Sequence, residues 1–208
     1  QRVGVAFSKD LINWEKHVGN PIMEADSQWY ELLDLNAWHD QAWRDPWVFS
    51  YKNQFHAFIT ARVNHGATDG RGVIGHAVSD DLLNWQIKPP LTEPGDFGQL
   101  EVPQLIEVNS KPHLIFSTDK FTHSQALLDF TGRPPITGSA SYAGETPLGP
   151  FSNDKNPWLF GDEAGSLYSG KFIRADKSSW MLMAFANYGE NGEFIGHIPD
   201  PFVVSEAK

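Results

Sequence analysis

The chain has 208 residues, and its 26 acidic against 16 basic residues give a formal net charge of −10 at pH 7. No cluster of Lys or Arg could neutralise a phosphate backbone, and no apolar run reaches the roughly 18 residues that cross a bilayer, so we expect neither nucleic acid nor a membrane as a partner. Cysteine is absent, which excludes disulfides and thiolate chemistry. This length predicts a single domain over residues 1–208.

In chain order, the first element is an apolar stretch from Val3 to Phe7 that leads into a polar turn. The pattern Ser-x-Asp-Leu-x-Asn-Trp occupies residues 8–14 and recurs at residues 79–85, again after an apolar stretch. Ser and Asp side chains form tight turns by accepting hydrogen bonds from nearby backbone N–H groups. The repeat therefore predicts two copies of a strand, a tight turn and a short return strand.

Three β-hairpins are expected downstream, at residues 47–61, 104–117 and 171–186, because strand-like runs flank short polar turns there. Units of three or four antiparallel strands recurring every 50 to 70 residues or so are typical of β-propeller blades. They begin at Ala42, Leu100 and Leu167, and residues 1–15 read as the end of an earlier, truncated blade. A short helix signal at Ser124 to Phe130 does not change the class.

The predicted fold is therefore all-β, of the five-bladed propeller type, with an incomplete set of about three to four blades. A complete ring of five would need more residues than these 208. Open blade edges expose unpaired strand groups, so two copies of the chain could pair through them as a homodimer.

Two carboxylates stand at the expected blade starts. Asp45 lies between Arg44 and Pro46 just before a strand, and Glu101 precedes Val102 and Pro103 in the next unit. The starting strands of propeller blades face the central channel, so both carboxylates are expected at equivalent positions in one funnel. Paired carboxylates suit glycosidic bond cleavage. Two structural readings stay open: Asp45 could cap a turn, and Glu101 could be an exposed strand-edge residue.

These motifs resemble those of glycoside hydrolase families 32, 68 and 43. Residues 43–46, Trp-Arg-Asp-Pro, are similar to the families' Arg-Asp-Pro motif, and residues 101–104, Glu-Val-Pro-Gln, to their acid-bearing Glu-x-Pro segment. The resemblance implies that Asp45 stabilises the transition state and Glu101 is the general acid/base, with Arg44 pairing with Asp45 or binding substrate. The families place a third carboxylate, the nucleophile or base, in a first-blade motif upstream of Gly4, and no segment here matches it.

Further residues are candidates for substrate binding. Trp43 belongs to the Arg-Asp-Pro motif, while Trp38 and His39 precede it closely enough to line the funnel mouth. Tyr168 starts a blade at the position expected to match Asp45 and Glu101, although a packed core tyrosine fits equally. The remaining candidate, Arg62, ends the strand after Asp45 and could bind hydroxyls or be solvated. No His pair has the spacing of a zinc helix, so we expect no metal and no other cofactor.

The sequence thus predicts a hydrolase acting on furanoside or pentoside glycans, namely fructans, arabinans or xylans, with an oligo- or polysaccharide as partner. Fructosyl linkages are favoured because the acid lies in Glu-Val-Pro-Gln rather than Glu-Gly-Pro. The alternative is a non-catalytic carbohydrate-binding propeller that lacks the third carboxylate. The compartment stays open, with a secreted or periplasmic location favoured over the cytoplasm.

Overall fold

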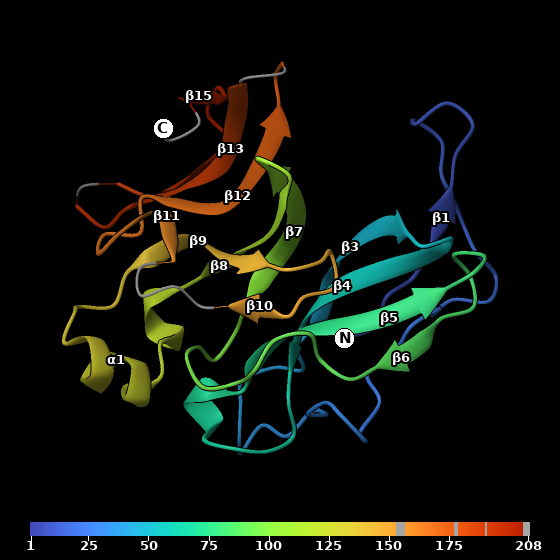
Figure 1. Ribbon diagram of the computed structural model, residues 1–208, viewed down its shortest axis with the longest axis horizontal. Coiled ribbons are helices and arrows are strands. Elements are labelled where there is room, and N and C mark those ends of the chain that lie inside the picture. The colour runs from blue at the N-terminus through green and yellow to red at the C-terminus, as the bar shows by residue number, and fades with distance from the viewer. Residues whose placement is uncertain (153–156, 177–178, 190, 206–208) are drawn as a thin grey trace.

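The computed structural model describes residues 1–152, 157–176, 179–189 and 191–205. Within these ranges, antiparallel strands form one two-stranded sheet and three larger sheets, and the single α-helix is α1 (Gln125–Thr131). Figure 1 shows the three larger sheets following one another in chain order, from the right of the view to the upper left. The all-β expectation is confirmed, and α1 matches the helix signal, with Ser124 as its N-cap.

The two-stranded sheet pairs β1 with β2, and we call the larger sheets blades A, B and C. Blade A has the order β3-β4-β5-β6, blade B the order β10-β9-β8-β7 with β11 also on β9, and blade C the order β12-β13-β14 with β15 also on β13. The strand bounds are β1 Ala6–Phe7, β2 Glu15–Lys16, β3 Trp43–Tyr51, β4 Gln54–Arg62, β5 Gly72–Ser79, β6 Gln86–Lys88, β7 Glu101–Val108, β8 Lys111–Thr118, β9 Thr137–Gly144, β10 Phe151–Ser152, β11 Trp158–Asp162, β12 Leu167–Arg174, β13 Ser179–Tyr188, β14 Phe194–His197 and β15 Phe202–Ser205.

The repeated Ser-x-Asp sequence folds the same way twice, between β1 and β2 and between β5 and β6. In the first copy Ser8 Oγ accepts from the N–H of Leu11, and Asp10 Oδ1 accepts from the N–H groups of Ile12 and Asn13. In the second copy Ser79 Oγ accepts from the N–H of Leu82, and Asp81 Oδ1 accepts from the N–H groups of Leu83 and Asn84. The expected turn is confirmed. Backbone hydrogen bonds from the turn lower the pKa of each Asp carboxyl, so the turn favours the ionised form.

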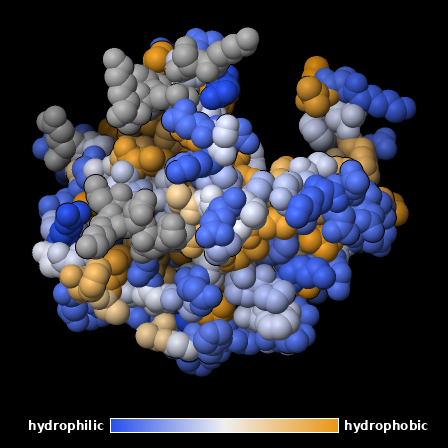
Figure 2. All heavy atoms as spheres, in the orientation of Figure 1, coloured by the Kyte–Doolittle hydropathy of each residue, from blue (hydrophilic) through white to orange (hydrophobic). Residues whose placement is uncertain are grey.

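The two turns differ in their surroundings. Trp85 of the second copy packs against the hydrophobic core, whereas Leu11, Ile12 and Trp14 of the first copy are exposed. Figure 2 shows this first turn projecting from the body, with hydrophobic and hydrophilic residues mixed at its tip. The turn geometry therefore comes from its own side chains rather than from packing.

The predicted hairpins join the first two strands of each blade. In blades A and B the connecting turns place two successive residues at positive φ, Lys52 and Asn53 in one and Asn109 and Ser110 in the other. Such turns match the right-handed twist of the flanking strands. All three hairpins are confirmed, and each strand extends one to four residues beyond the predicted run at its start or end.

Side-chain alternation stacks the blades face to face. On β4, Ala57, Ile59 and Ala61 point into one core cluster, while Phe58 points into the cluster shared with blade B. On β8, Leu114 and Phe116 face that same shared cluster, whereas Ile115 faces the cluster shared with blade C. Successive residues of a strand point to opposite faces, so each middle strand is buried on both sides. Consecutive blades thereby share one core, and their first strands lie beside one another.

Blade A also buries two histidines, His56 and His76, whose Nδ1 and Nε2 atoms are 3.0 Å apart. His56 Nε2 lies 3.2 Å from the carbonyl oxygen of Tyr51, so it must carry the proton that this acceptor needs. His56 Nδ1 then accepts from the Nε2–H of His76, which requires the ring of His56 to be neutral. Burial, followed by the charges of His56 and Lys88, lowers the pKa of His76 to about 4, and burial also lowers the pKa of His56.

Acidification is expected to destabilise the fold through this pair. A lowered folded-state pKa means that the stabilisation is complete above pH 6.5 and is lost as the pH falls toward about 4. Moving from pH 7.5 to 5 should cost about 2 kcal/mol of unfolding free energy, which corresponds to a fall in Tm of roughly 4–8 °C. Thermal unfolding of the wild type, His76→Gln and the exposed control His65→Gln measures this. A His76→Gln protein whose Tm depends on pH as steeply as that of the wild type would contradict it.

Candidate active site

The first strand of every blade has a bulge near its start. The pairing register jumps from Arg44 to Trp47 on β3, from Glu101 to Gln104 on β7, and from Tyr168 to Lys171 on β12. The residues immediately before these jumps occupy equivalent positions in the three blades. The bulge also bends each strand and re-aims the side chains beside it.

The expected equivalence of Asp45, Glu101 and Tyr168 is therefore wrong by one residue for Asp45. Arg44 is the residue that matches Glu101 and Tyr168, and Asp45 matches Val102 and Ser169. Those three bulge residues have φ angles of 57°, 45° and 55°. A non-glycine residue held in the left-handed region costs about 1–3 kcal/mol, and such strain clusters at functional sites.

The three equivalent residues meet where the blades come together. Arg44 Nη2 lies 2.5 Å from Glu101 Oε1, and the Tyr168 hydroxyl donates to Glu101 Oε2. Both oxygens of Glu101 are thus bound, one by blade A and one by blade C. The carboxyl group is held in a single orientation by partners from its two neighbouring blades.

Asp45 lies on the other side of Arg44 and also joins two blades. Its Oδ2 accepts from Thr60 Oγ1 at 3.1 Å on β4 and from the backbone N–H of Val102 at 3.4 Å on β7. The Arg44 Nε atom is 3.6 Å from the same oxygen. Within the part of the chain that the structure describes, these contacts all use Oδ2, which leaves Oδ1 to accept from other groups. Asp45 and Glu101 are therefore brought together through one guanidinium and one strand.

Arg44 also contacts the carboxylate of Asp40, through Nη1 at 3.0 Å. Burial alone would lower the pKa of the Arg44 guanidinium, but the hydrogen bond and charge of Glu101, with the charges of Asp40 and Asp45, outweigh burial and raise it. Gln99 Nε2 donates to the other Asp40 oxygen at 3.0 Å. The side chains of Arg44, Asp45 and Glu101 are 21%, 29% and 18% exposed, so the cluster is partly buried and still in contact with solvent.

Tyr168 is a permanent donor in this cluster. Burial, followed by the negative charge of Glu101 and the hydrogen bond to it, raises the pKa of the phenol above its ordinary value of 10.0. The hydroxyl therefore keeps its proton at neutral pH and holds the Glu101 oxygen.

The loop before β3 carries Trp38 and His39, and the residue that follows them, Asp40, joins it to the cluster. Asp40 anchors the loop to Arg44, and the exposed ring of His39 lies 3.9 Å from Asp40 Oδ1. The Trp38 ring stacks on the guanidinium of Arg62 at 3.8 Å. An aromatic ring and an exposed histidine thus directly precede the residue that binds Arg44.

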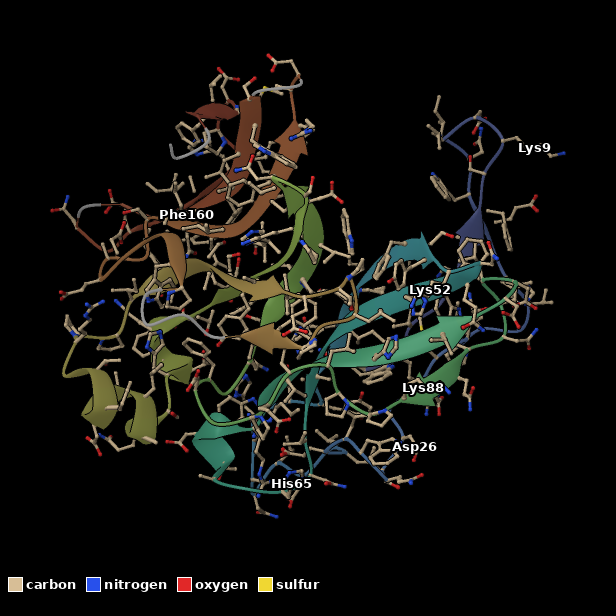
Figure 3. All side chains as sticks on the ribbon, viewed as in Figure 1. Lys9, Asp26, Lys52, His65, Lys88 and Phe160 are labelled. Carbon is tan, nitrogen blue, oxygen red and sulfur yellow. The ribbon has the colours of Figure 1, made fainter. Side chains whose placement is uncertain are left out.

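Trp43 and Arg62 lie apart from the carboxylates. Trp43 is fully buried and packs against Tyr30. Successive side chains of a strand point to opposite faces, so Trp43 points away from the site that Arg44 enters. Arg62 is 1% exposed, and its guanidinium donates to the carbonyls of Gly98 at 2.6 Å and Thr68 at 2.8 Å and pairs with Glu31. Both residues support the walls of the site in this structure. His65 lies three residues after Arg62, and Figure 3 shows it at the outer edge of the molecule.

Two polar residues of the cluster, Gln99 and Lys171, were not predicted from the sequence as site residues. Gln99 supports Asp40, and Lys171 donates from Nζ to the carbonyls of Val102 and Pro103 at 2.7 and 3.0 Å. Both flank residues that the motifs singled out, since Gln99 precedes Glu101 by two positions and Lys171 follows Tyr168 by three. Among the described residues, no group of three or more His, Asp or Glu side chains is placed to hold a metal ion, and no helix is long and apolar enough to span a membrane.

Comparison with known families gives a match over residues 1–193 to the model of the glycosyl hydrolases family 32 N-terminal domain. The chain belongs to this family. A sucrose-6-phosphate hydrolase from Streptococcus mutans serotype c is 35% identical over 102 residues, which cover 45% of this chain and 19% of the relative.

Three solved structures share the fold. An inulosucrase from Halalkalicoccus jeotgali bound to kestose matches with a TM-score of 0.76 and 18% identity, over 98% of this chain and 58% of that one. A Bacillus subtilis levansucrase gives 0.70 and 11%, over 99% and 58%. A mutant Bombyx mori family 32 β-fructofuranosidase in complex with sucrose gives 0.64 and 21%, over 95% and 40%.

These matches confirm the predicted family and the partial propeller fold. The family-32 chain described here spans 19% of the Streptococcus relative and 40–58% of the three solved proteins. Its three blades and the β1–β2 pair correspond to the three blades and the earlier blade end that the sequence predicts.

Proposed function

We propose that this family-32 chain forms part of a glycosidase that cleaves fructosyl linkages, with Asp45 and Glu101 as two of its catalytic carboxylates. The observation that carries the proposal is the single guanidinium of Arg44 binding both carboxylates where neighbouring blades meet. The relatives include a sucrose-6-phosphate hydrolase, an inulosucrase bound to kestose and a β-fructofuranosidase in complex with sucrose. They favour fructans and sucrose over the arabinans and xylans that the sequence also allowed.

The chemistry assigned to Glu101 is proton transfer at the glycosidic oxygen. A carboxylic acid within hydrogen-bond reach of that oxygen makes the leaving group neutral, and the resulting carboxylate then takes a proton from the incoming water or sugar hydroxyl. Arg44 and Tyr168 hold both Glu101 oxygens, which keeps the carboxyl oriented through the two steps.

Asp45 supports the positively charged transition state. The sugar ring acquires oxocarbenium character as the bond breaks, and a nearby carboxylate stabilises that charge more in the transition state than in the bound substrate. Thr60 and the Val102 N–H hold one Asp45 oxygen in place. The free oxygen can accept hydrogen bonds from sugar hydroxyls.

A third carboxylate has to reach the same sugar, because either stereochemical outcome requires a nucleophile or base opposite the acid. Trp38, His39 and Tyr168 are proposed substrate contacts at the rim and floor. For Trp43 and Arg62, burial favours a supporting role in which Arg62 holds Trp38 in place.

The alternative, a sugar-binding propeller without turnover, is separated from this proposal by one experiment. The full-length protein is incubated with sucrose, sucrose 6-phosphate, kestose, inulin oligosaccharides, arabino-oligosaccharides and xylo-oligosaccharides, with product analysis and binding calorimetry on the same samples. We expect fructosyl release or transfer with at least one fructosyl substrate and none with the pentose oligosaccharides. Binding without turnover would select the alternative, and turnover of arabinan or xylan fragments alone would overturn the fructosyl assignment.

A further inference from the structure

Lys171 makes a contact between blades that the proposed chemistry does not yet use. It follows the bulge of β12, and its Nζ donates to the carbonyl oxygens of Val102 at 2.7 Å and Pro103 at 3.0 Å on β7. These are the two residues directly after Glu101. The contact therefore acts on the short segment that sets the direction of the Glu101 side chain.

That segment needs an external partner. The β7–β8 ladder runs from Glu101 to Gln104 and skips Val102 and Pro103, so their carbonyls are outside the regular pairing. Val102 is β-branched and sits at φ 45°, where such residues are rarely found. A conformation of this kind persists only when its surroundings hold it. A charged ammonium group is a strong donor for two carbonyls at once.

Lys171 also brings a positive charge toward Asp45. The Lys171 side chain faces two residues of β3, the carboxylate of Asp45 and the ring of Trp47, whose centroid is 5.5 Å from Nζ. Its cross-strand neighbour on β13 is the uncharged Met183. Burial lowers the pKa of the Lys171 ammonium to about 8, and the negative charge of Asp45 opposes that shift. The group is thus charged at neutral pH and loses its proton at mildly alkaline pH.

We propose that Lys171 is a positioning residue whose ammonium group holds the Glu101–Pro103 bulge and sets the charge beside Asp45, so that the reaction requires its protonated form. This inference rests on the proposed function for its activity test. Deprotonation leaves a neutral amine that binds carbonyls weakly and no longer balances Asp45. The acid/base residue then loses its orientation while the substrate-binding rim is unchanged.

The first test compares kcat and KM for sucrose from pH 5 to 10 in the full-length wild type, Lys171→Met and Lys171→Arg. The wild-type kcat should fall through an apparent pKa near 8. Lys171→Met should lower kcat about 10- to 100-fold at neutral pH, leave KM within about threefold and lose the alkaline limb. Lys171→Arg, which stays charged, should recover most of kcat and move the limb above pH 9 or so. The exposed Lys9, far from the blades' meeting point in Figure 3, gives the matched control Lys9→Met.

Wild-type kcat and an unchanged alkaline limb in Lys171→Met would overturn the proposal. Loss of kcat in Lys171→Met and Lys171→Arg alike, with the limb unmoved, would also overturn it, because charge would then not matter. Misfolding is not expected, since Gln104 joins the same strands through two bonds to the Phe172 backbone at 2.7 and 2.9 Å.

A second measurement separates this inference from the proposed function. NMR of the wild-type chain with labelled lysine side chains follows the titration of Lys171, and hydrogen exchange follows the Val102 amide. We expect a titration near pH 8 and faster Val102 exchange in Lys171→Met than in Lys9→Met. If sucrose is not cleaved but both signals appear, only the proposed function fails. If Lys171 titrated at its ordinary pKa and Lys171→Met left the Val102 exchange rate unchanged, the proposed contact between Lys171 and the bulge would be contradicted.

Discussion

Replacing Glu101 by glutamine in the full-length protein is expected to lower kcat for sucrose by about 10³-fold, within the range of a lost general acid/base. Glutamine keeps the size of the side chain and still accepts from Arg44, but it has no proton to give to the leaving oxygen. A substrate with a good leaving group, such as a fructosyl fluoride, needs less protonation, so its kcat/KM, which reports cleavage of the first bond alone, should fall far less. Steady-state kinetics with both substrates measures the difference.

Glu107→Gln is the matched control, because Glu107 lies on the same strand, β7, and is exposed. It should keep kcat within about twofold of the wild type, as expected for a surface substitution away from the site. If Glu101→Gln retained wild-type activity on sucrose, or lost kcat/KM equally on both substrates, the acid/base assignment would be discarded.

Replacing Asp45 by asparagine should reduce kcat/KM for the same substrate by about 10²- to 10³-fold, the loss typical of removing one preorganised electrostatic group. The asparagine oxygen can still accept from Thr60, so the local fold is retained. The lost element is the negative charge next to the developing oxocarbenium ion. Since Asp45 is also expected to bind sugar hydroxyls, KM should rise together with the fall in kcat.

Asp80→Asn provides the comparison, because Asp80 is an exposed turn residue whose oxygen accepts from Gln54. Circular dichroism and Tm should show both variants folded. An Asp45→Asn enzyme as active as Asp80→Asn would remove Asp45 from the catalytic set.

The parts of the fold that the sequence predicts are those determined by local chemistry. The Ser-x-Asp turns form from side chains two and three residues away, and the hairpins follow from alternating strands joined by polar turns. Each of these signals lies within about ten residues of chain, where propensity and turn chemistry act directly. The order of three successive blades follows from repeating them.

The offset of Asp45 against Glu101 follows from the sequence once Pro46 is aligned with Pro103, but the bulges behind it could not be predicted in this way. A bulge shifts the register by whole residues, and Arg-Asp-Pro and Glu-Val-Pro align by eye without revealing which residue takes the positive φ angle. The direction of each side chain depends on that shift. For this reason the burial of Trp43 and the inter-blade contact of Lys171 emerge only from the packed structure.

The proposed function depends most on a single fructosyl ring contacting Asp45 and residue 101 together. A crystal structure of the full-length Glu101→Gln protein soaked with sucrose tests this directly. We expect a fructosyl ring with a hydroxyl in hydrogen-bond distance of Asp45 Oδ1 and its glycosidic oxygen facing residue 101. A sugar bound elsewhere, or one that reaches only one of these two side chains, would contradict it.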